Sequence, residues 1–539
     1  MELIDQHTKK IMEQCKVRAR DAGLTFEDET LEYIVTNKDM LNLSPKVMIP
    51  TLYDYWVHDV EVLKGYGKYQ LYPSNPYETV INSRPAISFY NDNNPDWMNI
   101  MIFYHVLAHI DFFQNNRMFE NTWTNDFVGQ ALADKRLIAS LRSEHGRWVD
   151  YVIEFSRSID NLVGYFHSLS QINFPKNIEP DEKVSYYFDN FLQKIENVSS
   201  IELFREIEKF NKFLDENSEL GESLFFSDVR IRYPEFQAKY EKHLADNSKE
   251  RKEDLMEYIH NHSPFLKKDE NTWMKSVMSI IRNTSMYFQP QIRTKTINEG
   301  WASYWHDELF RSDHRIKGHE SEYARLNAGV TSIRRVGLNP YAIGLRLIQH
   351  IEHLANRNKL CFEFQKMQGI EDRDNYNKPT GKGRDTIFNL RRHFSDFTLF
   401  NSFVDQDFVD EYNLFVVGQR LDESRGVYQY YIKSRKAEDY KKMLIDSLYH
   451  PPIITVNEEK SGEKNLYLVH RFENKQLIKD FIPETMMGIE FLWGAQIQLE
   501  TMEIVNTGTK DGDDNIIFEY RKVLYTIKDR KITKMNLEA

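Results

Sequence analysis

The sequence contains little cysteine and no long apolar run. Only Cys15 and Cys361 occur among its 539 residues, which excludes a disulfide framework and a zinc module built on cysteines. No stretch approaches the roughly 18 consecutive apolar residues of a membrane-spanning helix. The first ten residues also lack the apolar segment of a signal peptide. We therefore expect a cytoplasmic protein with no membrane span.

A surplus of basic residues is also missing. Lys and Arg number 70 against 82 Asp and Glu, giving a net charge of −12. A general nucleic-acid binder normally presents a basic face, so we expect no nucleic-acid partner. Aromatic residues are plentiful, with 34 Phe and 30 Tyr, and they supply material for large cores. The length predicts more than one domain.

Hydrophobic spacing predicts a mainly α-helical domain over residues 1–395, followed by a smaller α+β domain over 396–539. The first domain carries a short β-hairpin with strands at 79–81 and 86–90. Residues 176–270 are rich in Glu, Lys and Asp, which predicts a charged helical insertion with solvated faces. Further helices are expected at 5–35, 45–66, 97–119, 270–311 and 339–357. Strands are expected at 427–432, 453–456, 466–469, 495–499, 516–520 and 523–527.

The helix at 97–119 contains His105 and His109, whose four-residue spacing places both rings on one face. The remaining faces are mostly apolar, which indicates a buried helix. A buried imidazole without a polar partner costs about 1–3 kcal/mol, and a metal ion would satisfy both rings. The spacing also arises by chance among 17 histidines, so two core histidines bonded to carbonyls or carboxylates are the alternative.

A second segment supplies a carboxylate. Glu299, Ser303 and His306 fall on one face of the helix at 270–311, so Glu299 and His306 are candidate third and fourth metal ligands. The alternative is structural, because Thr296 and Glu299 also match a capping box, in which the Glu bonds a backbone N–H. Spacing does not separate these two interpretations. Near the end of the helix at 339–357, His350 and His353 are expected to be exposed to solvent.

Three ordered segments together resemble the SpoVR family. They are His105-Val-Leu-Ala-His109-Ile-Asp111 with Asn115-Asn116, Asn298-Glu299-Gly300-Trp301-Ala302-Ser303-Tyr304-Trp305-His306, and Asn339-Pro340-Tyr341-Ala-Ile-Gly344. The resemblance runs across residues 40–360, and the segment 490–500 looks similar too. SpoVR-like proteins are associated with sporulation and spore cortex formation, and relatives elsewhere accompany a PrkA-type serine kinase. The resemblance thus implies a protein partner in a PrkA-type kinase system and names no reaction.

The segment Asn298-Glu299-Gly300-Trp301-Ala302 is also similar to the Asn-Glu-Gly-Phe-Ala segment of gluzincin aminopeptidases. That similarity implies a zincin-like fold, with zinc held by His105, His109 and Glu299. Position 106 is Val where those peptidases carry the Glu that activates water. The catalytic residue is therefore unknown, and the polar neighbours grouped as supporting residues are Asp111, Asn116, Asn298, Ser303 and Tyr304.

Two functions remain open. One is a metal-dependent hydrolase that cleaves a peptide or a peptidoglycan-derived amide. The other is a regulatory or assembly protein with a closed or degenerate site for zinc, iron or manganese. Val106 favours the second function, and the polar residues gathered around a buried helix favour the first. The sequence does not specify an oligomeric state.

Overall fold

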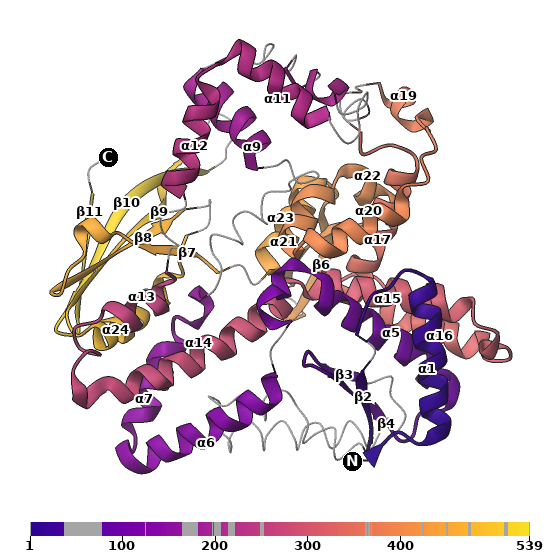
Figure 1. Ribbon diagram of the computed structural model, residues 1–539, viewed down its shortest axis with the longest axis horizontal. Helices are drawn as coiled ribbons and strands as arrows, with labels where there is room; N and C mark the ends of the chain where they lie inside the picture. Colours follow the sequence, from indigo (N-terminus) through magenta and orange to yellow (C-terminus); the bar gives the residue numbers. More distant parts are fainter. Residues whose placement is uncertain are drawn as a thin grey trace. The chain divides into compact units, whose positions relative to one another are not determined.

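The computed structural model describes residues 2–36, 78–163, 182–198, 206–213, 221–247, 253–361, 364–448, 451–472, 476–510 and 516–537, apart from single positions and residue pairs within these ranges. Figure 1 labels many of its helices and strands, and the chain divides into two compact units. Unit 1 comprises Met1–Asn173 and Asp254–Ala539, and unit 2 comprises Phe174–Glu253. The mainly helical architecture with a short N-terminal β-hairpin and an α+β C-terminal region is confirmed. The domain boundary at 395/396 stays a prediction.

Unit 1 begins with a small mixed sheet beside helix α1 (Gln6–Asp21). Its strands lie in the order β1 (Glu2–Leu3), β2 (Thr30–Val35), β4 (Ala86–Asn91), β3 (Glu78–Ile81), with β2 parallel to β4. The predicted hairpin is confirmed as β3 and β4. The predicted helix at 5–35 is wrong beyond Asp21, because Gly23 adopts φ +102° and ends α1. The predicted helix at 45–66 lies outside the described residues.

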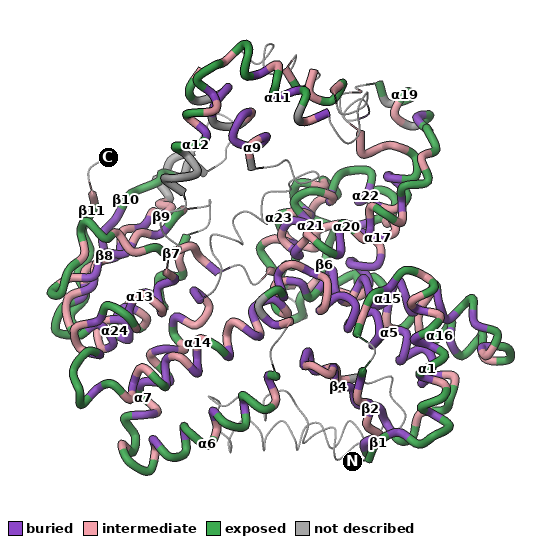
Figure 2. The backbone as a smooth tube through the Cα atoms, viewed as in Figure 1, coloured by how far each residue is buried: buried purple, intermediate pink, exposed green. Residues whose placement is uncertain are grey.

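Helix α5 (Asp96–Asn115) follows β4 in the chain and contributes many residues to one hydrophobic core of unit 1. Every residue from Met98 to Phe113 is buried, as the tube in Figure 2 shows. Helix α15 (Lys295–Arg311) packs against both α5 and α17 (Pro340–Asn356). These three helices and α1 belong to one hydrophobic core, which also includes α20 (Gly383–His393). The core explains why α5 carries so few polar residues.

The other described helices of unit 1 include several that share a second hydrophobic core with the C-terminal sheet. These other helices are η1 (Arg117–Thr122), α6 (Phe127–His145), α7 (Trp148–Arg157), η2 (Asp160–Leu162), α13 (Leu255–His262), η4 (Asp269–Asn271), α14 (Thr272–Arg293), η5 (His314–Ile316), α16 (Glu320–Thr331), α19 (Ile370–Asn375), α21 (Asp396–Phe403), α22 (Gln406–Glu411), α23 (Ala437–Ser447), η6 (Glu458–Lys460), η7 (Lys479–Phe481) and α24 (Ile482–Trp493). Within the described ranges, no helix combines the length and apolarity that crossing a membrane requires.

The C-terminal region of unit 1 contains two sheets. Five strands lie in the order β11 (Lys531–Asn536), β10 (Ile516–Lys528), β9 (Gln496–Lys510), β8 (Asn465–Arg471), β7 (Ile453–Val456), and β5 (Val416–Asp422) pairs with β6 (Val427–Ser434). The strands predicted in this region are confirmed, except that residues 516–527 form one strand instead of two. Strands β5 and β11 were not predicted, because their sequences do not alternate regularly between apolar and polar residues.

Unit 2 is helical, as its composition predicts. Its described elements are α9 (Glu182–Ser185), the π-helix η3 (Tyr186–Ile195), α11 (Gly221–Arg232) and α12 (Phe236–Asn247). Besides its charged residues, unit 2 contains a buried aromatic cluster that includes Tyr187, Phe191, Phe225 and Phe236. Unit 2 therefore has a hydrophobic core of its own.

Candidate metal centre

Helix α5 positions the two histidines. Their side chains leave the same face one turn apart, and the ring centroids lie 4.6 Å from each other. Only 4% of His105 and 6% of His109 is exposed. The helix holds this spacing because the apolar residues around the pair are packed on all sides. The expectation of a buried pair on one face is confirmed.

Helix α15 brings Glu299 to the pair through a very close crossing with α17. Gly300 faces Gly344 at this crossing, and a Cβ added at Gly344 would lie 2.1 Å from the carbonyl oxygen of Thr296. Only residues without side chains allow the two backbones to approach so closely. The two glycines therefore allow α15 to lie where its Glu299 faces the histidines of α5.

The first turn of α15 is capped by a residue from elsewhere in the chain. Both carboxylate oxygens of Asp396 accept hydrogen bonds, at 2.8 Å, from the backbone N–H groups of Thr296 and Ile297. The N-cap residue Thr294 makes no side-chain cap. Burial raises the pKa of Asp396 to about 7, against the lowering effect of these bonds. The capping box is thus not formed, and Glu299 is available to the histidines.

Three ligand atoms converge at this point. The Nε2 atoms of His105 and His109 lie 3.8 and 3.6 Å from Oε2 of Glu299, and the potential ligand atoms of all three residues lie within 4.8 Å of one another. Zinc–ligand bonds of about 2.0–2.1 Å at tetrahedral angles place neighbouring ligand atoms about 3.3 Å apart. The observed separations are close to that value and longer than ordinary hydrogen bonds.

The Glu299 carboxyl is ionised, as metal binding requires. Burial alone would raise its pKa, but His105 and His109 outweigh this effect and hold the pKa of the carboxyl below its ordinary value. The carboxyl is therefore an anion at neutral pH. Its side chain is 16% exposed, more than either imidazole, but the Oε2 atom that faces the histidines is buried.

His306 lies behind His105, away from the convergence point. Its Nδ1 atom is 2.8 Å from Nδ1 of His105, and its Nε2 atom is 3.0 Å from Oδ1 of Asn327. The amide of Asn327 is oriented by its own donation to Asp307. An amide oxygen only accepts, so Nε2 of His306 donates and Nδ1 of the neutral ring accepts from His105. When His105 is neutral, its lone pair is therefore on Nε2, and when the ring is protonated, Nε2 also carries a proton, which faces Glu299.

Asn298 orients the second imidazole in the same way. Its Oδ1 atom lies 3.0 Å from Nδ1 of His109, so Nδ1 donates and Nε2 carries the lone pair. Asn298 and Glu299 are neighbours on α15, and each reaches the same histidine at a different nitrogen. One turn of helix therefore supplies both a candidate ligand and the group that sets the tautomer of another.

The remaining predicted residues lie in different surroundings. Asp111 accepts hydrogen bonds from Thr25, Trp301 and Arg391 on another face of α5, and burial raises its pKa to about 6 despite these bonds. Asn116 binds the carbonyls of Arg391 and Phe394. The hydroxyl of Tyr304 donates to Glu352, and Ser303 is fully buried. The structure therefore brings together the two histidines with Glu299, backed by Asn298 and His306.

Three residues near the site were not predicted as part of it. Asn327 completes the hydrogen bonds behind His306, Asp396 caps α15, and the ring of Tyr341 stacks at 6.1 Å from that of His105. Only Tyr341 had a sequence signal, because it belongs to the Asn339-Pro340-Tyr341 segment at a helix start. The other two reach the site from elements distant in sequence.

The arrangement provides three potential metal ligands. Two neutral imidazoles and one carboxylate are the donors of catalytic zinc sites, in which three protein ligands leave a position for water or substrate. Among the described residues, the only group of three or more potential metal ligands is this one. Val106, on α5 between the histidines, is fully buried and supplies no base.

Comparison with known proteins agrees with these motifs. The model of the family described as SpoVR like protein matches residues 2–450. The chain belongs to the SpoVR family. Among curated SpoVR relatives, the uncharacterized protein YcgB of Escherichia coli (strain K12) is 24% identical over 497 residues, covering 87% of this chain and 86% of YcgB. No solved structure matches this SpoVR chain.

Proposed function

We propose that this SpoVR protein binds a divalent metal ion, zinc in the first instance, through His105, His109 and Glu299. The convergence of their three ligand atoms carries the proposal. Two further contacts support it, because His306 and Asn298 bind the Nδ1 atoms and favour the tautomer with the lone pair on Nε2 in both neutral imidazoles. A pair of core histidines with no ligand to bind would not require a common direction for both lone pairs.

The activity that this donor set supports best is metal-dependent hydrolysis of a peptide or a peptidoglycan-derived amide in the cytoplasm. A zinc ion on three protein ligands supplies Lewis acidity and an activated water. The protein holds the donors in place through the packing of α5, the Gly300–Gly344 crossing and the cap from Asp396. Strands β3 and β4 precede the histidine helix, an order that is consistent with a zincin-like arrangement.

A non-catalytic role is the second candidate. Val106 removes the usual base, which typically contributes 10²–10⁴-fold to the rate, and both imidazoles are almost completely buried. Under this proposal, the metal stabilises the contact between α5 and α15, and the protein acts as a regulatory or assembly factor. Its partner would be a PrkA-type kinase system or the machinery of sporulation.

Elemental analysis of the purified full-length chain tests the metal site. We expect about one equivalent of metal in the wild type and almost none in a His105→Ala/His109→Ala variant. A His314→Ala/His319→Ala variant is the matched control, because these histidines are exposed by 82% and 41%. A folded wild type that neither contains metal nor takes up added Zn²⁺ would overturn the proposal.

The two candidate functions separate in a second measurement. Hydrolysis of a labelled peptide and of a peptidoglycan fragment is followed for the zinc-loaded wild type and for Glu299→Gln. Metal-dependent turnover that disappears in Glu299→Gln supports the hydrolase. Full metal occupancy without turnover, together with a large stabilisation of the fold by zinc, supports the structural role.

A further inference from the structure

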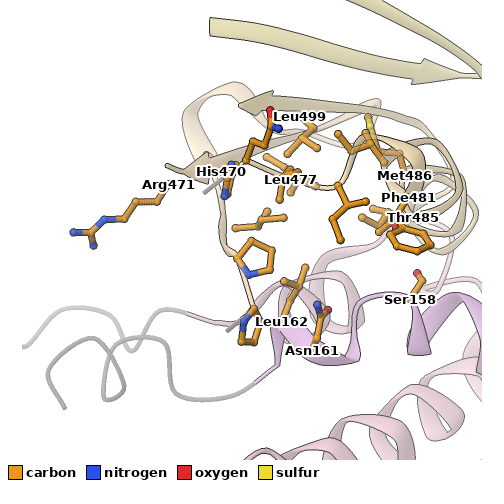
Figure 3. A pocket seen from close by; sticks show the side chains of 18 of the residues that line it. Ser158, Asn161, Leu162, His470, Arg471, Leu477, Phe481, Thr485, Met486 and Leu499 are labelled. Atoms are coloured by element: carbon orange, nitrogen blue, oxygen red, sulfur yellow. The ribbon is translucent and has the colours of Figure 1, made fainter. Parts of the chain in front are cut away.

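The C-terminal region of unit 1 contains a cavity of about 320 Å³ that is not part of the metal centre. Its walls come from β7, β8, β9 and α24, and from the segment at the end of α7 and in η2. Figure 3 shows Leu499 on one side, Met486 and Thr485 on another, and Leu162 and Asn161 opposite Leu499. The side chains surround a slot instead of covering a flat patch.

The chemistry of the wall is strongly aliphatic. Leu, Ile, Met and Pro side chains make up most of the described lining, and no acidic residue is among the described residues that line it. This is notable in a chain with 82 Asp and Glu. Branched aliphatic walls offer few hydrogen bonds to water molecules in the cavity. Ligand pockets of about 300–1,000 Å³ typically have this composition.

Basic groups lie at one edge of the slot. His470 is buried and its Nδ1 atom lies 2.8 Å from the hydroxyl of Thr501. Arg471 is exposed at the same edge, and Figure 3 shows its side chain extending outward from the cavity. An apolar interior with a basic edge and no described acidic lining is complementary to an aliphatic chain that ends in an anion.

We propose that this cavity binds the aliphatic chain of a fatty acid, with the carboxylate at the edge formed by His470 and Arg471. The slim, flexible chain suits a half-open slot between sheet, helix and loop. The head group stays near solvent at the edge beside Arg471, so no unpaired charge is buried. This proposal does not depend on the metal centre, because none of its residues belongs to that centre.

Titration of the full-length protein with dodecanoate, followed by calorimetry, tests the proposal. The blocking variant is Thr485→Trp, because Thr485 of α24 lines the slot and a larger side chain would occupy it. Met487→Trp is the matched control on the same helix, since Met487 is 37% exposed and outside the lining. We expect saturable binding of one dodecanoate to the wild type, and binding weaker by about tenfold or more in Thr485→Trp only.

The head group is tested separately. Arg471→Gln should weaken dodecanoate binding several-fold and leave dodecanol binding unchanged. Circular dichroism and the urea midpoint establish whether each variant is folded. If Thr485→Trp is unfolded, Ile454→Phe on β7 serves as the blocking variant, because Ile454 also lines the cavity. Equal binding to the blocked and control variants, or no saturable binding to the folded wild type, overturns the cavity as a site. Dodecanol binding as sensitive to Arg471→Gln as dodecanoate binding overturns the assignment of the anionic end.

Discussion

Helix α5 carries two buried polar clusters, and they differ in how their polar atoms are arranged. Asp111 accepts hydrogen bonds of 2.8–2.9 Å from Thr25, Trp301 and Arg391. On another face, His105 and His109 face Glu299 across 3.8 and 3.6 Å, beyond ordinary hydrogen-bond distance. In the first cluster, the polar groups hydrogen-bond to one another directly. In the second cluster, the separations are close to those of ligands around a metal ion.

This difference teaches that burial of polar groups does not by itself identify a functional site. Both clusters lie in the same core and both join α5 to α15. The cluster at Asp111 uses opposite charges in direct contact, so removing either partner would leave a buried charge unpaired. The histidine cluster instead directs its donors toward one point. We therefore expect substitutions at Asp111 to change stability, and substitutions around the histidines to change metal affinity.

The largest effect is expected from Asp111→Ala. This substitution leaves the guanidinium of Arg391 buried without its carboxylate, and breaking such a pair costs about 3–5 kcal/mol. Urea unfolding measures the loss. Asp111→Asn is the control, because an amide keeps an acceptor for Trp301 and should cost less. A loss below 1 kcal/mol in Asp111→Ala would contradict the structural role of this cluster.

The second-largest effect is expected at the crossing of α15 and α17. Gly344→Ala places a methyl group 2.1 Å from the carbonyl oxygen of Thr296, so α15 and α17 must separate. Overpacking of this kind costs about 1–3 kcal/mol, and the displacement of Glu299 should also weaken zinc binding. Gly329→Ala in α16 is the matched control, since nothing lies within 4 Å of its added Cβ. That variant should be unchanged or more stable by about 0.5–1 kcal/mol.

A smaller and more selective effect is expected at His306. Loss of a group that orients a metal ligand typically lowers metal affinity 10–100-fold, so His306→Ala should weaken zinc binding by about that factor. Unfolding of the metal-free protein should change little by comparison with Asp111→Ala. Competition with a chelator of known affinity measures the change.

The size of that loss also decides the role of His306. A loss as complete as in His105→Ala would make His306 a direct ligand, as its position in the sequence predicts. Unchanged affinity would mean that the hydrogen bond between the two Nδ1 atoms does not set the tautomer of His105. His319→Ala, at a partly exposed histidine in the neighbouring loop, controls for the loss of an imidazole.

Local spacing predicted the parts of the site that lie within one helix. His105 and His109 share a face because they are four residues apart, and Glu299 follows from its motif. Asn327 and Asp396 were out of reach, since their contacts join residues that are 21 and 100 positions apart. Residues 22–35 were assigned to a helix because apolar spacing alone does not show where Gly23 ends α1.

His350 provides a third case for this comparison, because it is a buried histidine whose Nδ1 lies within hydrogen-bond distance of a carboxylate. It was expected to be exposed. Its side chain is only 3% exposed, with Nδ1 2.8 Å from Glu411 and Nε2 3.6 Å from Asp405. Burial alone would lower the pKa of His350, but the two carboxylates outweigh it and raise the pKa above the ordinary value. Protonated His350 therefore stabilises the fold, fully so below pH 6.5, and this contribution is lost as the pH rises through the raised pKa.

His350→Gln should accordingly remove part of the decline in stability above pH 6.5. The effect should be the smallest of the four, on the order of 1 kcal/mol, because both carboxylates are about half exposed and are screened by solvent. Urea midpoints measured from pH 5.5 to about 9 for wild type and variant give the slope. His353→Gln on the same helix should keep the decline, because burial and Arg357 lower the pKa of His353 instead. Parallel slopes for wild type and His350→Gln would mean that the carboxylates hold His350 without stabilising its charged form.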